Sequence, residues 1–123
     1  MAWLRRRRPA STDAPTDRQA REATIAYLRD FVATRVGVEA YVEPRTNVTP
    51  TTIMLVATDG EWTRRKVPDA RAAGVLAREL AIPVYDVQRT GYPQRMRDWN
   101  SRKTAERKRM LSGDDGTTEG TTA

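Results

Sequence analysis

The sequence contains no cysteine and no histidine among its 123 residues. The chain can therefore form neither a disulfide framework nor a thiolate nucleophile, and it has no imidazole base. A zinc site of Cys and His ligands and a Ser-His-Asp triad are excluded for the same reason. Carboxylates, lysines, tyrosines and hydroxyls remain as catalytic candidates, and they form no recognisable constellation. We therefore expect a protein that is not an enzyme, with no catalytic residues, no metal site and no cofactor.

Long apolar runs are missing as well. The longest, Ile53 to Ala57, is far shorter than the roughly 20 residues that cross a bilayer. At the N-terminus, Arg5 to Arg8 are followed by the polar stretch Pro9 to Asp17 instead of the apolar segment of a secretory signal. The sequence therefore predicts a soluble cytoplasmic protein that does not interact with membranes.

The net charge of +6 is concentrated in two segments of the chain. Residues 1–16 carry four Arg and one Asp, a net charge of +3, and residues 91–112 carry seven basic and two acidic groups, a net charge of +5. Residues 37–90 are neutral, and residues 113–123 carry three carboxylates and no cation. Arg outnumbers Lys by 19 to 3, which is typical of a GC-rich coding sequence. Only part of the basic excess therefore indicates a binding function.

Hydrophobic spacing predicts a helix over Asp17–Val36, in which Ile25, Leu28 and Val32 share one face. Gly37 is expected to end this helix in the left-handed conformation. Two strands follow along the chain.

The first of these strands, Val38–Glu43, alternates apolar and polar residues and is predicted to be half-buried. The second, Thr51–Thr58, is apolar on both faces, which is typical of a strand in the middle of a sheet.

Asp59-Gly60 predicts a two-residue hairpin turn that places Trp62 of the next strand, Glu61–Val67, opposite Ala57. That strand carries the basic run Arg64 to Lys66, and unpaired charges of this kind cannot be buried. One interpretation is an edge strand protected by its charges. The other is a binding face in which Trp62 lies between cations.

Pro68 and Asp69 are predicted to begin a second helix, whose inward face includes Leu76 and Leu80. A short strand over Ile82–Val87 follows, and Pro83 favours an edge position for it. The element order is α-β-β-β-α-β. We therefore expect an α+β fold, a two-layer domain with both helices on one face of the sheet.

The domain organisation follows from this order. The α+β domain is expected over residues 16–90 and a basic C-terminal helix over residues 91–112. This helix is expected either to dock on the domain through Met96 and Trp99 or to fold on a partner. Residues 1–15 are expected to be a disordered basic arm and residues 113–123 a disordered acidic tail.

Four segments carry a resemblance to other proteins: Tyr41 to Thr46, Asp59 to Arg65, Pro83 to Val87 and Gly91 to Arg97. In these segments the chain resembles an uncharacterised family of small basic proteins from high-GC Gram-positive bacteria. The resemblance covers about residues 40 to 100 and implies no activity and no functional residues.

The element order is also similar to the restriction-endonuclease-like core, a resemblance of topology alone. Active enzymes with that core hold Mg²⁺ with an acid on the central strand and an acid-x-Lys pair on the next one. Here the central strand has no acid, and Arg64 stands where the acid before Lys66 is required. The resemblance therefore implies an inactive relative that can still bind nucleic acid.

Two functions remain open. The first is a small non-enzymatic protein that binds the phosphate backbone of DNA or RNA without sequence specificity. The second is a protein-protein interaction or assembly module, or self-association, through the sheet edge and the C-terminal helix. The candidate nucleic-acid-binding residues are Arg5, Arg6, Arg7, Arg8, Trp62, Arg64, Lys66, Arg95, Arg97, Arg102, Lys103, Arg107, Lys108 and Arg109.

Overall fold

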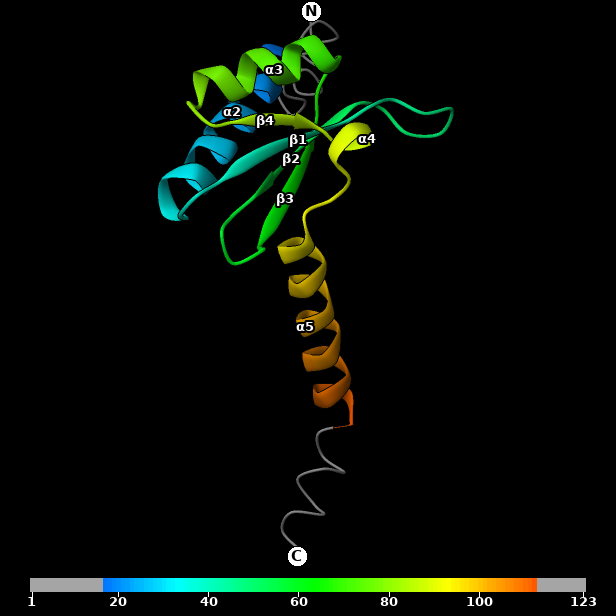
Figure 1. Cartoon of the computed structure of the whole chain (residues 1–123). Coiled ribbons are helices and arrows are strands. Elements are labelled where there is room, and N and C mark those ends of the chain that lie inside the picture. The colour runs from blue at the N-terminus through cyan, green and yellow to red at the C-terminus, as the bar shows by residue number, and fades with distance from the viewer. Residues whose placement is uncertain (1–16, 113–123) are drawn as a thin grey trace, which may run out of the picture. The chain divides into compact units, whose positions relative to one another are not determined.

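The protein is described here by a computed structural model that covers residues 17–112 (Figure 1). The chain divides into two compact units, residues 1–34 and 35–123. The predicted basic arm with Arg5 to Arg8 and the predicted acidic tail lie outside the described residues.

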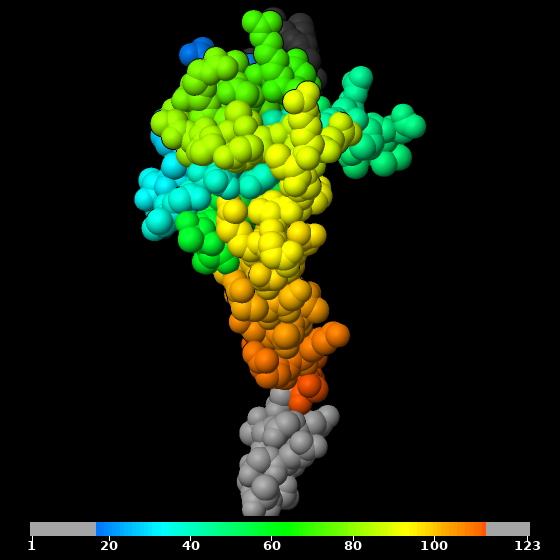
Figure 2. All heavy atoms as spheres, viewed as in Figure 1, coloured from blue at the N-terminus to red at the C-terminus, as the bar shows by residue number. Residues whose placement is uncertain are grey.

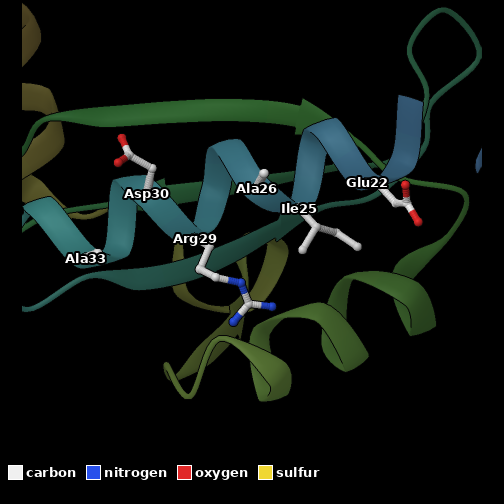
Figure 3. Close-up of a pocket in the computed structure, with 6 residues that line it drawn as sticks. All are labelled: Glu22, Ile25, Ala26, Arg29, Asp30 and Ala33. Atoms are coloured by element: carbon white, nitrogen blue, oxygen red, sulfur yellow. The ribbon is translucent and has the colours of Figure 1, made fainter. Parts of the chain in front are cut away.

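Helix α2, Asp17–Thr34, is the described part of the first unit. It begins at the predicted residue and ends two residues before the predicted end at Val36. Leu28 is buried and Ile25 is partly buried, which confirms the helical spacing of the apolar residues. Six residues of α2 line a shallow hollow of about 400 Å³ on its surface: Glu22, Ile25, Ala26, Arg29, Asp30 and Ala33 (Figure 3).

The second unit is built on a four-stranded mixed sheet in the order β3-β2-β1-β4. The apolar strand β2 lies between β1 and β3, as predicted, and pairs with both in antiparallel orientation. The short strand β4 pairs in parallel with β1 and forms an edge of the sheet, which confirms the position favoured by Pro83. The strands are β1 Glu39–Glu43, β2 Thr52–Val56, β3 Trp62–Lys66 and β4 Val84–Asp86.

The hairpin between β2 and β3 differs from the prediction. Its loop has three residues instead of two, because Ala57 N–H donates to the carbonyl of Glu61 (2.8 Å) and Gly60 N–H donates to the carbonyl of Ala57 (2.9 Å). Gly60 adopts a φ of +96°, which is the left-handed position that follows a type I turn in three-residue hairpins. Trp62 therefore lies opposite Val56, and the predicted pairing with Ala57 is wrong by one residue.

Three further helices belong to the second unit. Helix α3, Ala70–Glu79, begins at Asp69, whose carboxylate accepts from Ala72 N–H at 2.8 Å. It contacts β1, β2 and β4. The short helix α4, Val87–Thr90, was not predicted; Asp86 caps it and thereby ends β4 before the predicted end of that strand. Helix α5, Gln94–Leu111, lies within the range 91–112 predicted for the basic C-terminal helix.

The core of the second unit lies on both faces of the sheet. On one face Tyr41, Met54 and Val56 are buried together with Met96 from the first turn of α5. On the other face, Ala40 is fully buried. The prediction that β1 is half-buried is therefore wrong at its centre, because the start of α5 covers the face that was expected to be open.

The α+β class is confirmed by these elements. In Figure 1, α3 runs over one side of the sheet and α5 leaves from the other. That α2 and α3 share one face of the sheet stays a prediction. Within residues 17–112, no helix combines the length and the apolar character needed to cross a bilayer.

Candidate functional site

The first turns of α5 are anchored on the β2–β3 hairpin. Met96 is 6% exposed in the core cluster, and Arg95 Nε donates to the carbonyl of Ala57 at 2.9 Å. One turn later, Asn100 Oδ1 accepts from the indole N–H of Trp62 at 2.8 Å. These contacts join the helix to β3 and to the hairpin loop. They support the docking of α5 on the domain, one of the two roles expected for Met96.

Gly60 lets the hairpin loop and α5 approach each other closely. A Cβ atom at this position would lie 2.0 Å from the carbonyl oxygen of Arg95 and 2.9 Å from Cβ of Trp99. Neither contact can be relieved by a side-chain rotation, because the first involves backbone and the second is the base of a side chain. Trp99 is partly buried and lies directly against this loop, so both predicted anchors of α5 face the domain.

Beyond the anchored turns, α5 is open to solvent. Every residue from 100 to 112 is exposed, and Met110 and Leu111 are 81% and 83% exposed. Figure 2 shows the orange part of α5 standing clear of the sheet and hairpin. More than half of α5 is therefore exposed to solvent and does not pack into the core of the second unit.

The cations of α5 fall into two groups. Arg102 donates to the carbonyl of Asp59 at 2.9 Å, and Lys103 lies over the ring of Trp99 at 4.5 Å and near Glu106 at 3.5 Å. Arg102 thus adds a contact between α5 and the hairpin loop, whereas both contacts of Lys103 lie within α5. Within residues 17–112, the other exposed cations of the helix have no carboxylate at ion-pair distance; they are Arg97, Arg107, Lys108 and Arg109.

Glu43 organises a polar cluster on the face of the sheet near α5. Arg64 reaches it with two hydrogen bonds, Nε to Oε1 at 2.6 Å and Nη2 to Oε2 at 2.8 Å. Thr52 donates to the same carboxylate at 2.6 Å, and the Tyr92 hydroxyl donates to Oε2. The guanidinium of Arg64 also lies 4.9 Å from the ring centre of Trp62. The two hydrogen bonds from Arg64 to Glu43 form a bidentate arginine–carboxylate pair, which is the strong form of such an ion pair.

A second cluster of the same kind surrounds Glu39. Arg95 Nη2 donates to Glu39 Oε1 at 2.7 Å, and the Tyr41 hydroxyl donates to the same oxygen at 3.0 Å. Each cluster thus contains one glutamate of β1, one arginine and one tyrosine. Both glutamates point to the same face because they alternate along the strand with period two.

The ionisation of these groups follows from their contacts. Burial disfavours the charged form of Glu43, but the hydrogen bonds from Arg64, Thr52 and Tyr92 outweigh it and hold the pKa of Glu43 below its ordinary value. The same carboxylate raises the pKa of Tyr92, because it accepts a hydrogen bond from the protonated hydroxyl and would repel a phenolate. Burial, and then the hydrogen bond to Glu39, raise the pKa of Tyr41.

Several candidate binding residues from the sequence therefore have other partners. Arg64 and Arg95 each pair with a glutamate, and the indole N–H of Trp62 is held by Asn100. β3 is an edge strand, as the first interpretation of the basic run expected. Lys66 on this strand is exposed.

The two glutamate clusters were not found from the sequence. The alternation of Glu39, Tyr41 and Glu43 does indicate that the three share one face. Their cationic partners, however, are distant in the chain: Arg64 is 21 residues from Glu43 and Arg95 is 56 residues from Glu39. No local spacing identifies such pairs.

Within the described residues, no three side chains of the types His, Cys, Asp and Glu come together in a group that could hold a metal ion. The comparisons with known proteins found no matching family model, no matching curated protein and no matching solved structure. The family resemblance and the endonuclease-like topology therefore stay predictions.

Proposed function

We propose that this protein is a small non-enzymatic nucleic-acid-binding protein, located in the cytoplasm, whose helix α5 contacts the phosphate backbone. The observation that carries the proposal is that four exposed cations of α5 lack carboxylate partners among residues 17–112: Arg97, Arg107, Lys108 and Arg109. Exposed cations without internal partners are free to replace the counterions of a polyphosphate, and that release drives non-specific binding.

The proposal assigns different roles to the basic residues. Arg97, Arg107, Lys108 and Arg109 make the phosphate contacts, and Arg102 and Lys103 add to the local potential from the anchored turn. Arg64 and Arg95 stabilise the fold through their glutamates and do not bind phosphate directly.

A protein partner is the second candidate function. Met110 and Leu111 at the end of α5 are almost fully exposed, and β4 is exposed at all three of its residues. Apolar side chains at a helix end and an unpaired strand edge are both suited to a protein contact.

Salt dependence tests the proposal directly. We expect a fluorescein-labelled 20-base-pair DNA duplex to bind at about 50 mM salt, with an affinity that falls steeply toward about 200 mM. Replacing Arg97, Arg107, Lys108 and Arg109 with Gln should flatten the log–log slope by about 3 to 4, since each phosphate contact contributes about 0.9.

The matched control removes the same charge elsewhere in the second unit. Arg45, Arg71, Arg78 and Arg89 are also exposed, and their replacement with Gln lowers the net charge equally. If the control weakens binding as much as the α5 variant, net charge alone is responsible and α5 is not the interface. Absence of binding at about 50 mM salt would favour the protein-partner function.

A further inference from the structure

Helix α5 carries its cations in three rows, and their arrangement bears on the kind of nucleic acid that it can bind. Successive residues of an α-helix are rotated by about 100°, so residues four, seven or eleven apart share a face. Arg102 and Arg109 form one row, and Lys103 and Arg107 form a second. A third row, Arg97 and Lys108, lies between the other two on the remaining side of the helix.

Small side chains lie beside the third row. Ser101, Thr104 and Ala105 form a shallow hollow with their neighbours Asn100 and Lys108. This face points away from the anchor, because Met96 and Trp99 occupy the opposite side of the helical wheel. The face of α5 turned away from the hairpin therefore carries small side chains on both sides of the row of Arg97 and Lys108, with Arg109 on one flank and Arg107 on the other.

A flat surface would use only one of these rows. A groove whose two walls both carry phosphates can neutralise Arg107 and Arg109 at once. The long side chains of Arg97 and Lys108 can extend from the face between them to either wall, and the small side chains beside them let the helix approach the floor. The solvent-exposed part of α5, residues 100–111, extends for about 18 Å at 1.5 Å per residue, which is enough to lie in such a groove.

Groove dimensions select the type of duplex. The major groove of B-form DNA is about 12 Å wide and admits an α-helix, whereas its minor groove is about 6 Å wide. The major groove of an A-form RNA duplex is deep and too narrow for side chains to read. We infer that α5 binds in the major groove of double-stranded DNA with the face of Ser101, Thr104 and Ala105 toward the base edges.

This inference rests on the proposed function and adds the class of ligand and the face of the helix. The hydroxyl groups of Ser101 and Thr104 can donate to or accept from base edges of either type, so they impose little sequence preference. Binding is then largely independent of sequence but dependent on groove shape.

The test compares four labelled probes at one salt concentration near 50 mM. They are a 20-base-pair DNA duplex, the RNA duplex of the same sequence, one DNA strand alone, and the DNA duplex with a glucosyl group on C5 of each cytosine. The glucosyl groups fill the major groove and leave the phosphate charge unchanged. We expect the unmodified DNA duplex to bind at least 10-fold more tightly than the other three.

The outcomes separate the two claims. Equal affinity for the plain and glucosylated duplexes, or for the RNA duplex, overturns major-groove binding and leaves the phosphate-binding function intact. If the protein binds none of the four probes, both the phosphate-binding function and major-groove binding are overturned.

A variant that keeps the charge tests the face of the helix. Ser101→Leu with Ala105→Leu fills the small face, and we expect it to lose at least 10-fold in affinity for the DNA duplex and little for the single strand. Ala20→Leu with Ala23→Leu, at exposed positions of α2, adds similar bulk elsewhere and should leave both affinities unchanged. An unaltered affinity of the α5 variant for the DNA duplex would overturn the assignment of this face.

Discussion

At the scale of single residues, Glu43 connects more of the structure than its position at a strand end suggests. Its carboxylate accepts from Arg64 on β3, Thr52 on β2 and Tyr92 in the segment before α5. It therefore ties three parts of the chain to β1. Replacing the carboxylate with an amide removes the charge and one of the two acceptor oxygens shared by Arg64, Thr52 and Tyr92, which costs about 1 to 3 kcal/mol for a hydrogen-bonded charged group.

Glu43 predicts how stability depends on pH. Because the pKa of Glu43 is lower in the folded protein than in the unfolded chain, the carboxylate stabilises the fold above about pH 4.5, and this contribution is lost as pH falls through the folded-state pKa. Glu43→Gln should lower the free energy of unfolding at pH 7 by about 1 to 3 kcal/mol and flatten its decrease toward acid. Urea unfolding followed by tryptophan fluorescence between pH 7 and pH 3 measures both effects.

The control for this prediction is Glu79→Gln. Glu79 is an exposed residue of α3, and its replacement should leave the acid limb of the stability curve unchanged. A Glu43→Gln curve parallel to that of the parent protein would show that the hydrogen bonds to Glu43 contribute no stability.

Gly60 provides a second prediction at this scale. Gly60→Ala places a side chain at a φ of +96° and a Cβ atom 2.0 Å from a backbone oxygen of α5, so we expect a loss of more than about 1 kcal/mol in unfolding free energy. Gly91→Ala is the matched control, because Gly91 has a φ of +72° with no atom within 4 Å of the added Cβ. A similar loss in both variants would mean that backbone conformation, and not the approach of α5, explains the effect.

At the scale of elements, α5 has two parts with different roles. Its first turns belong to the core through Met96, while residues 100–112 are exposed throughout. Stability and binding are therefore expected to respond to different substitutions within one helix.

The two anchoring side chains of α5 can be truncated without changing the net charge of the protein. Met96→Ala with Trp99→Ala should lower the unfolding free energy by about 2 to 5 kcal/mol, since a core methionine and a partly buried indole are both truncated. The variant with Arg97, Arg107, Lys108 and Arg109 replaced by Gln should change it by less than about 0.5 kcal/mol. Thermal or urea unfolding of the two variants measures the contrast, and equal losses would contradict the division of the helix into two parts.

At the scale of the whole molecule, positive charge is separated from the neutral domain. Residues 37–90 carry seven groups of each sign, and the excess lies at residues 1–16 and 91–112. Residues 113–123, with Asp114, Asp115 and Glu119, oppose this excess with three negative charges. Under the proposed function, the electrostatic field expected to attract a polyphosphate depends on all of these segments.

This charge balance predicts the effect of neutralising the acidic segment. Replacing Asp114 and Asp115 with Asn and Glu119 with Gln raises the net charge from +6 by three, with no change in length. We expect the affinity for a DNA duplex to increase at about 50 mM salt and the difference to shrink at about 200 mM, because salt screens the added attraction. An increase that persists unchanged at high salt would contradict an electrostatic origin.

Local sequence patterns were sufficient for the elements within residues 17–112, except for the short helix α4. The apolar run at β2 predicted the central strand, the basic segment at residues 91–112 predicted a helix there, and Asp69 predicted the start of α3. These signals are readable because a helix cap, a strand period and a turn each involve residues that are close in the chain.

The contacts between elements required the folded structure. The hairpin register depended on one more loop residue than Asp59-Gly60 indicated, and this moved every cross-strand pair by one position. Arg64 and Arg95, two of the candidate nucleic-acid-binding residues, are instead partners of Glu43 and Glu39. The sequence shows how many cations the chain has, but pairing a cation with a carboxylate depends on distances in space that only folding creates.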